Sequence, residues 1–113
     1  MNRKEQLTSE LKRVLRILSD ERTVQSVIVF GSYVSGDISG FSDLDMVVIQ
    51  DTDLNFWDRL KEMKKLLQPR VGMDVLVYTP DEYRKMRKSR PFVREEISKK
   101  GMTVYERKHE QVA

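Results

Sequence analysis

The chain has 113 residues and no cysteine, and its Lys and Arg residues exceed its Asp and Glu residues by three. This length suits one domain and leaves too few residues for a separate substrate domain. The lack of cysteine excludes disulfides and thiolate metal sites, and the single histidine, His109 in the tail, excludes a Ser-His-Asp triad in the body of the fold. Because no apolar run approaches the roughly 18 residues of a membrane span or resembles a signal peptide, we expect a cytoplasmic protein without a membrane partner.

Two helices and two strands are predicted over residues 4–68. Apolar residues recur every three or four positions over residues 4–19, which indicates an amphipathic helix. Residues 24–30 end in four apolar positions, as expected of a strand covered on both faces. A second strand is predicted over residues 44–49 and a second amphipathic helix over residues 56–68, which Pro69 ends.

Between the two strands lies the sequence GSYVSGDISGFSDLD, residues 31–45. Gly31 and Ser32 directly follow the first strand, where a sharply turning backbone and a hydroxyl can approach phosphate oxygens. Asp43 and Asp45 lie two residues apart at the start of the second strand, so both carboxylates face the same way. These two features meet at one edge only if the strands are antiparallel, which we therefore predict.

A third carboxylate, Asp74, interrupts an apolar strand predicted over residues 71–79. The preceding helix is the usual crossover between parallel neighbours, so this strand is expected beside the second one, with Asp74 near Asp43 and Asp45. Burying a lone carboxylate costs several kcal/mol. We therefore expect Asp74 either to pair with Arg70 or a neighbouring lysine, or to serve as a metal ligand. All-oxygen ligation favours Mg²⁺ or Mn²⁺.

The C-terminal third predicts two helices and a short final segment. Thr79, Pro80 and Glu82 form a helix start with a capping box, and Pro91 opens a second helix that Gly101 ends. Residues 102–106 are either a strand or an extended tail. Six basic residues in this region suit a solvated helix face or a surface for an acidic partner, an RNA backbone or the triphosphate itself: Arg84, Lys85, Arg87, Lys88, Arg90 and Arg94.

The spacing from Gly31-Ser32 to Asp43-Leu44-Asp45, with Asp74 as a third acid, resembles the DNA polymerase beta-like nucleotidyltransferase superfamily. The short length resembles its minimal members, the MntA-type proteins that are often paired with a HEPN-domain partner. The resemblance covers residues 24–79. It implies the nucleotidyltransferase fold, an α/β (α+β) arrangement in the order α-β-α-β-α-β-α-α with a small mixed sheet. We expect one domain, residues 1–113, with a core at about 24–79, C-terminal helices at about 80–100 and a tail at 107–113.

The same resemblance assigns roles to these residues. Asp43 and Asp45 would hold two Mg²⁺ ions, or Mn²⁺ in their place, and Asp74 would hold the ion that activates the acceptor and could act as general base. Gly31 and Ser32 would bind the β and γ phosphates of a nucleoside triphosphate. Many members carry a basic residue after this pair, whereas here Tyr33-Val34-Ser35 follows. Ser35 is either a further hydrogen-bond donor to the nucleotide or a turn serine.

The function implied by the resemblance is transfer of AMP from ATP to a hydroxyl, often of a tyrosine, on a HEPN-family toxin, with this chain as the antitoxin. Two alternatives stay open: a non-catalytic antitoxin that neutralises by contact, and a transferase acting on RNA or a small-molecule hydroxyl. Nucleic acid is the less favoured partner because the larger transferases of that kind carry an additional domain. A homo-oligomer is compatible with the sequence.

Overall fold

The computed structural model describes residues 1–108, so His109 and the end of the expected tail lie outside the described residues. Along the chain, the elements are α1 (Arg3–Ser19), β1 (Val24–Phe30), α2 (Ser32–Ser35), β2 (Leu44–Gln50), α3 (Phe56–Leu67), β3 (Met73–Tyr78), α4 (Pro80–Ser89), the π-helix η1 (Val93–Lys99) and β4 (Met102–Glu106). None of the helices in this part of the chain is long and apolar enough to cross a membrane.

The four strands form one mixed sheet in the order β3-β2-β1-β4. β1 is antiparallel to β2 and to β4, whereas β2 and β3 are parallel and joined through α3. Both pairings predicted from the sequence are confirmed, and residues 102–106 are a strand. The antiparallel pairing brings the end of β1 and the start of β2 to the same edge of the sheet.

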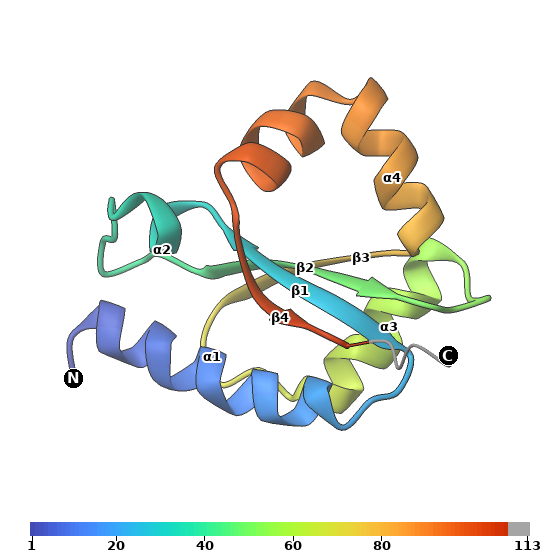
Figure 1. Ribbon diagram of the computed structural model, residues 1–113. Helices are drawn as coiled ribbons and strands as arrows, with labels where there is room; N and C mark the ends of the chain where they lie inside the picture. Colours follow the sequence, from blue (N-terminus) through green and yellow to red (C-terminus); the bar gives the residue numbers. More distant parts are fainter. Residues whose placement is uncertain (109–113) are drawn as a thin grey trace.

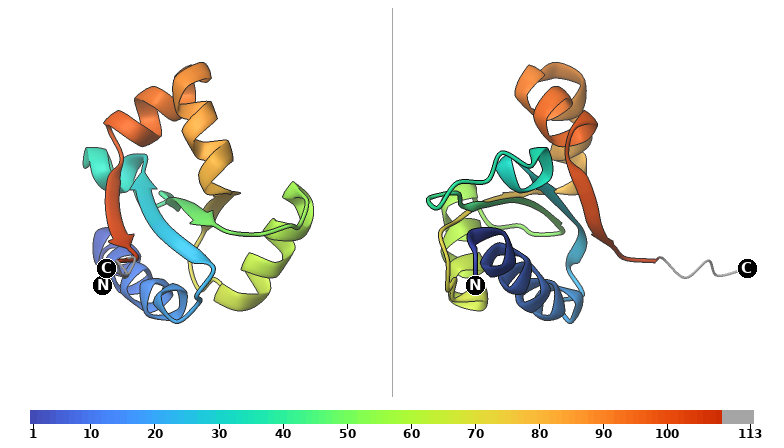
Figure 2. Two further views of the ribbon diagram at one scale, coloured as in Figure 1. Left: turned by 45° about the vertical axis from the view of Figure 1, so that its right-hand side comes forward. Right: turned by 90° about the vertical axis from the view of Figure 1, so that its left-hand side faces the viewer.

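Helices cover both faces of the sheet, with α1 and α3 on one face and α4 and η1 on the other (Figures 1 and 2). Alternate residues of β2 serve the two faces. Leu44, Met46 and Val48 join the larger core under α1 and α3, and Val47 and Ile49 join the smaller core under η1. Asp45 therefore lies on the α4 and η1 face.

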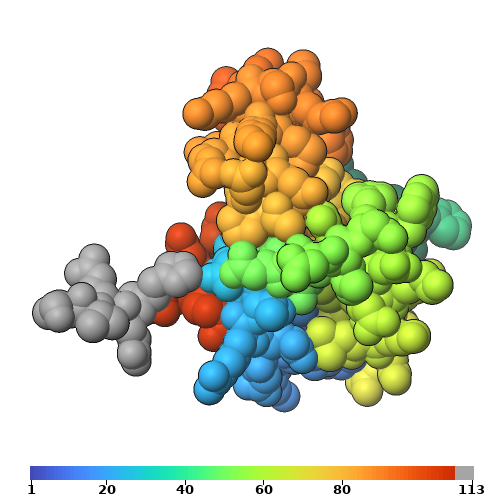
Figure 3. Space-filling model, turned by 90° about the vertical axis from the view of Figure 1, so that its right-hand side faces the viewer, coloured from blue at the N-terminus to red at the C-terminus, as the bar shows by residue number. Residues whose placement is uncertain are grey.

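α4 begins as the sequence predicted and is fixed by an arginine that the sequence did not single out. The Thr79 side chain accepts a hydrogen bond from the Glu82 amide, and Glu82 accepts one from the Thr79 amide, which completes the capping box. Arg59 of α3 is buried, lies 2.6 Å from Glu82 Oε1, and donates to the carbonyls of Leu54 and Val77. This contact anchors the base of α4, which stands out from the rest of the molecule in Figure 3.

A second buried carboxylate joins α1 to the segment before β3. The Glu10 side chain is 3% exposed, accepts two hydrogen bonds from Arg13 at 2.6 and 3.0 Å, and accepts one from the Arg70 amide at 2.6 Å. The Arg13 hydrogen bonds, with help from the Arg70 amide, hold the pKa of Glu10 below its ordinary value. Glu10 thereby fixes two segments that are 60 residues apart.

We expect Glu10→Gln to lower the free energy of unfolding by about 1–3 kcal/mol near neutral pH, because it removes the charge that these donors stabilise. A lowered folded-state pKa means that this stabilisation is present above the ordinary glutamate pKa and is lost as the pH falls through the folded-state value. Urea unfolding at neutral and acidic pH should therefore show a difference between variant and wild type that shrinks in acid. Glu62→Gln, whose glutamate is exposed, should change little at either pH.

Candidate functional site

Three aspartates lie at one edge of the sheet, and we call Asp43, Asp45 and Asp74 the acidic edge. In the parallel pairing of β2 and β3, Asp45 is the direct neighbour of Asp74. Met73 and Val75, on either side of Asp74, pack toward α1 and α3, so Asp74 faces the same side of the sheet as Asp45. The predicted meeting of the second and third strands at these acids is confirmed.

Two glycines let the carboxylates lie directly against the backbone. A Cβ at Gly31 would overlap the Asp45 carboxylate, and a Cβ at Gly72 would overlap the Asp43 carboxylate. Gly31 also has a φ of 77°, in the region that favours glycine. The sequence motif identified Gly31 but not Gly72, whose role depends on the pairing of β3 with β2.

Asp45 is the carboxylate with the strongest electrostatic perturbation. Burial, then the Asp74 charge, a hydrogen bond with Asp74 and the Asp43 charge raise the pKa of Asp45 to about 6. Two neighbouring carboxylates that cannot both ionise freely share a proton or attract a cation. The acidic edge therefore favours binding of a positively charged ligand.

The other two aspartates are more accessible. Asp74 is exposed, which corrects the expectation of a buried charge, because β3 is an edge strand and leaves one side of Asp74 open. Within residues 1–108 it forms no ion pair, with Arg70 or with any lysine. Asp43 lies 3.9 Å from Arg3, whose Nε donates to the Ser42 carbonyl at 2.8 Å.

A cavity of about 560 Å³ adjoins the Gly-Ser turn. Gly31, Ser32 and Ser35 line it from the turn and α2, and Glu96 and Lys100 line it from η1 and its C-terminal end. Within α2, the Val34 and Ser35 amides donate to the Gly31 carbonyl, which holds the turn tightly. The predicted phosphate-binding residues therefore border one cavity.

Ser35 and Tyr33 have structural contacts of their own. Ser35 Oγ donates to the Ser32 carbonyl at 3.4 Å and accepts from the Asp37 amide at 3.3 Å, as expected of a turn serine, while it still borders the cavity. The Tyr33 hydroxyl lies 2.7 Å from Thr8 Oγ1 of α1, so Tyr33 packs against α1.

Lys100 is a candidate binding residue that the sequence analysis missed. Its Nζ lies 3.2 Å from Glu96 of the same helical segment, and both side chains border the cavity at Gly31 and Ser32. Buried Ile97 and Val93 anchor η1 on the sheet and so fix this segment beside the turn. In the part of the chain that the structure describes, Lys100 is the only basic residue that lines this cavity. No local motif could have revealed it, because it lies more than sixty residues from the turn.

The basic residues from Arg84 to Arg94 mostly have local partners. Arg84 and Lys85 both pair with Asp81, Arg94 pairs with Glu95 at 3.2 Å, and the Arg87 guanidinium lies 5.8 Å from the Tyr83 ring. These contacts are typical of a solvated helix face rather than of a binding surface.

The acidic edge fits a divalent cation by the chemistry of its donors. The carboxylates provide only oxygen ligands, and burial, followed by the charges of Asp74 and Asp43, raises the pKa of Asp45 to about 6. Within residues 1–108 no three His, Cys, Asp or Glu side chains already converge as a metal cluster. Asp45 and Asp74 are direct neighbours in the sheet, and Asp43 would complete the set by turning from Arg3.

Comparisons with known proteins point to one family. Residues 12–110 match the family "Polymerase beta, Nucleotidyltransferase". A candidate nucleotidyltransferase from Sulfolobus solfataricus has a similar structure, with a TM-score of 0.66, 20% identity, and coverage of 92% of this chain and 84% of that one. No match is found among curated proteins.

Two toxin–antitoxin complexes also contain a chain of similar fold. The tri-AMPylated HEPN toxin of Shewanella oneidensis in complex with MNT antitoxin gives a TM-score of 0.51 at 15% identity, covering 89% of this chain and 73% of that one. A mutant MntA-HpeT toxin–antitoxin complex gives 0.52 at 17% identity, covering 87% and 73%. At these identities the likeness concerns the fold.

Proposed function

This chain belongs to the polymerase beta family of nucleotidyltransferases, and we propose that it transfers AMP from ATP to a hydroxyl of a HEPN-family protein partner. The observation that carries this proposal is the position of the acidic edge beside the Gly-Ser turn, at one edge of the sheet. A turn suited to phosphates and carboxylates suited to a cation are the two parts that phosphoryl transfer requires.

The triphosphate would bind in the cavity at Gly31 and Ser32. The Ser32 hydroxyl and the backbone of the turn can donate to phosphate oxygens, and Lys100 supplies a positive charge on the facing wall. This lysine would replace the basic residue that many relatives carry after the Gly-Ser pair. Its present partner, Glu96, is half exposed and can be released to solvent when a phosphate arrives.

The reaction exchanges one oxygen–phosphorus bond for another. The acceptor oxygen attacks the α-phosphorus and forms a new P–O bond, the bond from the α-phosphorus to the bridging oxygen breaks, and pyrophosphate leaves. The acceptor proton passes to a base, and exposed Asp74 is the carboxylate that an incoming hydroxyl can reach most easily. Asp45, its direct neighbour in the sheet, is held against Gly31.

Mg²⁺, or Mn²⁺ in its place, would be held by Asp43, Asp45 and Asp74. Bound Mg²⁺ supplies charge stabilisation at the attacking and leaving oxygens and lowers the pKa of the acceptor hydroxyl. The fit is supported by an all-oxygen donor set in which burial, and after it the charges of Asp74 and Asp43, raise the pKa of Asp45.

A protein acceptor is supported by the structural relatives of the chain. Structures of similar fold include a complex of a HEPN toxin with MNT antitoxin and a toxin–antitoxin complex with AMP-PNP. We propose that a HEPN-family protein completes the pocket of this chain as well.

The direct test is to incubate the protein with labelled ATP, Mg²⁺ and the product of the adjacent reading frame as the candidate HEPN-family partner. We expect label on the partner with wild type, none with Asp43→Asn, and none when EDTA replaces Mg²⁺. Complex formation without label transfer would instead support a non-catalytic antitoxin, and label on RNA or a small molecule alone would identify another acceptor.

The role of Lys100 is tested separately. We expect Lys100→Ala to lower kcat/KM for the nucleoside triphosphate by about tenfold or more, because one charge-assisted hydrogen bond to phosphate is lost. Most of the change should appear as a higher KM, and Lys100→Arg should restore it. The matched control is Lys99→Ala, because Lys99 pairs with Glu95 and does not border the cavity. Equal effects at positions 99 and 100 would contradict the assignment.

A further inference from the structure

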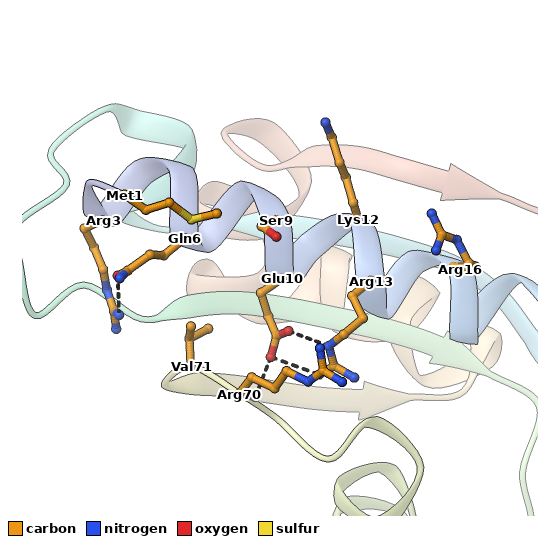
Figure 4. Close-up of a pocket in the computed structure, with 10 residues that line it drawn as sticks. All are labelled: Met1, Arg3, Gln6, Ser9, Glu10, Lys12, Arg13, Arg16, Arg70 and Val71. Atoms are coloured by element: carbon orange, nitrogen blue, oxygen red, sulfur yellow. Dashed lines mark hydrogen bonds and ion pairs between the residues drawn. The ribbon is translucent and has the colours of Figure 1, made fainter.

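A groove of about 570 Å³ runs between α1 and the segment before β3, and five basic residues line it (Figure 4). We call these residues, Arg3, Lys12, Arg13, Arg16 and Arg70, the basic groove. The only acidic residue that borders it is Glu10, the buried carboxylate bonded to Arg13 and to the Arg70 amide. The groove therefore carries a concentrated positive charge in a chain whose net charge is only +3.

Most of this charge has no internal partner. Among residues 1–108, Lys12, Arg16 and Arg70 form no ion pair, and all three are exposed. Glu10 is satisfied within the floor of the groove, so it adds no acceptor at the surface. The unpaired cations can bind an external anion without first breaking an internal contact.

The floor of the groove is rigid. Glu10 joins α1 to the backbone at Arg70, and Arg13 also donates to the Gln68 carbonyl at 3.2 Å. These bonds tie the two walls together although one belongs to α1 and the other precedes β3. A preorganised site loses less entropy on binding than a mobile one.

The basic groove leads to the acidic edge but is separate from the triphosphate cavity. Arg3, near the N-terminus of α1, borders the groove and lies 3.9 Å from Asp43. Val71 also borders the groove and directly precedes Gly72, the glycine that lies against the Asp43 carboxylate. The cavity at Gly31 and Ser32 is instead lined by η1, on the opposite face of the sheet. A ligand in the groove would therefore reach the acidic edge at Asp43, from the face of the sheet opposite the triphosphate cavity.

We propose that the basic groove binds an acidic segment of the protein acceptor and so orients its hydroxyl at the acidic edge. The orienting role depends on the function proposed above, whereas binding of an acidic peptide does not. Guanidinium groups match carboxylates as bidentate partners, and four of the five basic residues are arginines, three in the α1 wall and one in the facing wall.

The lining of the groove favours a protein over a nucleic acid. None of the ten residues that border it is aromatic, whereas single-stranded nucleic acids are bound largely by stacking of bases on aromatic side chains. Its apolar contributions come from Met1, Val71 and the stems of the arginines, which suit aliphatic and acidic side chains.

The test uses fluorescence anisotropy with two labelled probes of matched charge, a deca-glutamate peptide and a single-stranded uridine oligonucleotide. The groove variant Lys12→Glu/Arg16→Glu/Arg70→Glu is compared with the control variant Lys61→Glu/Lys64→Glu/Lys65→Glu. Both variants change three exposed residues and the net charge by the same amount, and the control residues lie on α3. Circular dichroism verifies that both fold.

We expect wild type and the control to bind the peptide and the groove variant to bind it about tenfold or more weakly. Equal weakening in both variants would show a net-charge effect and overturn the proposal, as would failure of wild type to bind the peptide. Tighter, groove-dependent binding of the oligonucleotide would identify a nucleic acid as the occupant and also overturn it. In the label-transfer assay with the HEPN partner, equal transfer by the groove variant and by wild type would refute the orienting role. Absence of transfer by wild type would refute only the proposed function.

Discussion

Replacing Asp45 with Asn is expected to reduce nucleotidyl transfer by about 10²–10³-fold or more, the scale seen when a preorganised charge-stabilising group is removed. Asp45 is the central member of the acidic edge: it adjoins Asp74 in the sheet and lies against Gly31. The asparagine keeps the shape but loses the negative charge. The measurement is the rate of label transfer to the protein acceptor at saturating ATP and Mg²⁺.

Loss of activity in this variant should not come from unfolding. Burial and Asp74 raise the pKa of Asp45 to about 6, so its charge opposes folding at neutral pH. We therefore expect Asp45→Asn to unfold at the same or a higher urea concentration than wild type in EDTA. Asp53→Asn, at an exposed position after β2, should leave both activity and stability unchanged. Folded Asp45→Asn protein with wild-type activity would contradict the assignment.

Replacing Gly31 with Ala is expected to impair both stability and activity. The positive φ makes any side chain unfavourable here, at a cost of about 1–3 kcal/mol. The added methyl would also overlap the Asp45 carboxylate, so the aspartate must move. Because a displacement of about 1 Å can reduce the rate about 10²-fold, we expect a loss of that order in label transfer.

Gly36→Ala separates these two causes. Gly36 has a φ of 89°, but apart from its two chain neighbours no atom of residues 1–108 lies within 4 Å of the position its Cβ would take. It should therefore show the loss of stability, measured by urea unfolding, without the large loss of activity among molecules that remain folded. Similar activity in the two folded variants would show that the contact between Gly31 and Asp45 does not control the reaction.

The sequence predicted those parts of the structure that depend on short segments. The motif from Gly31 to Asp45 predicted a polymerase beta-like nucleotidyltransferase, and the family match over residues 12–110 confirms it. The capping box at Thr79 and the apolar periodicity of α1 and α3 also predicted their elements, because local hydrogen bonds and one buried face determine them. The antiparallel pairing of β1 and β2 was predicted because the Gly31-Ser32 pair and the two aspartates of the motif lie close together only if these strands are antiparallel.

What the sequence could not predict depends on contacts between distant segments. Lys100 reaches the Gly-Ser turn only through the packing of η1, and Gly72 approaches Asp43 only through the pairing of β3 with β2. The exposure of Asp74 has a similar cause. Its apolar neighbours suggested a buried strand, whereas the sheet order places β3 at an edge, and no periodicity distinguishes an edge strand from a central one.

Because β3 is an edge strand, water can compete with the acceptor hydroxyl at Asp74. Because Asp74 is exposed, an acceptor held by another folded protein can reach it directly, but bulk water reaches it equally well. Selection of the correct nucleophile would then rest on how accurately the docked acceptor is aligned rather than on exclusion of water. We therefore expect the isolated chain to hydrolyse ATP slowly, and we expect docking of the acceptor to suppress this hydrolysis.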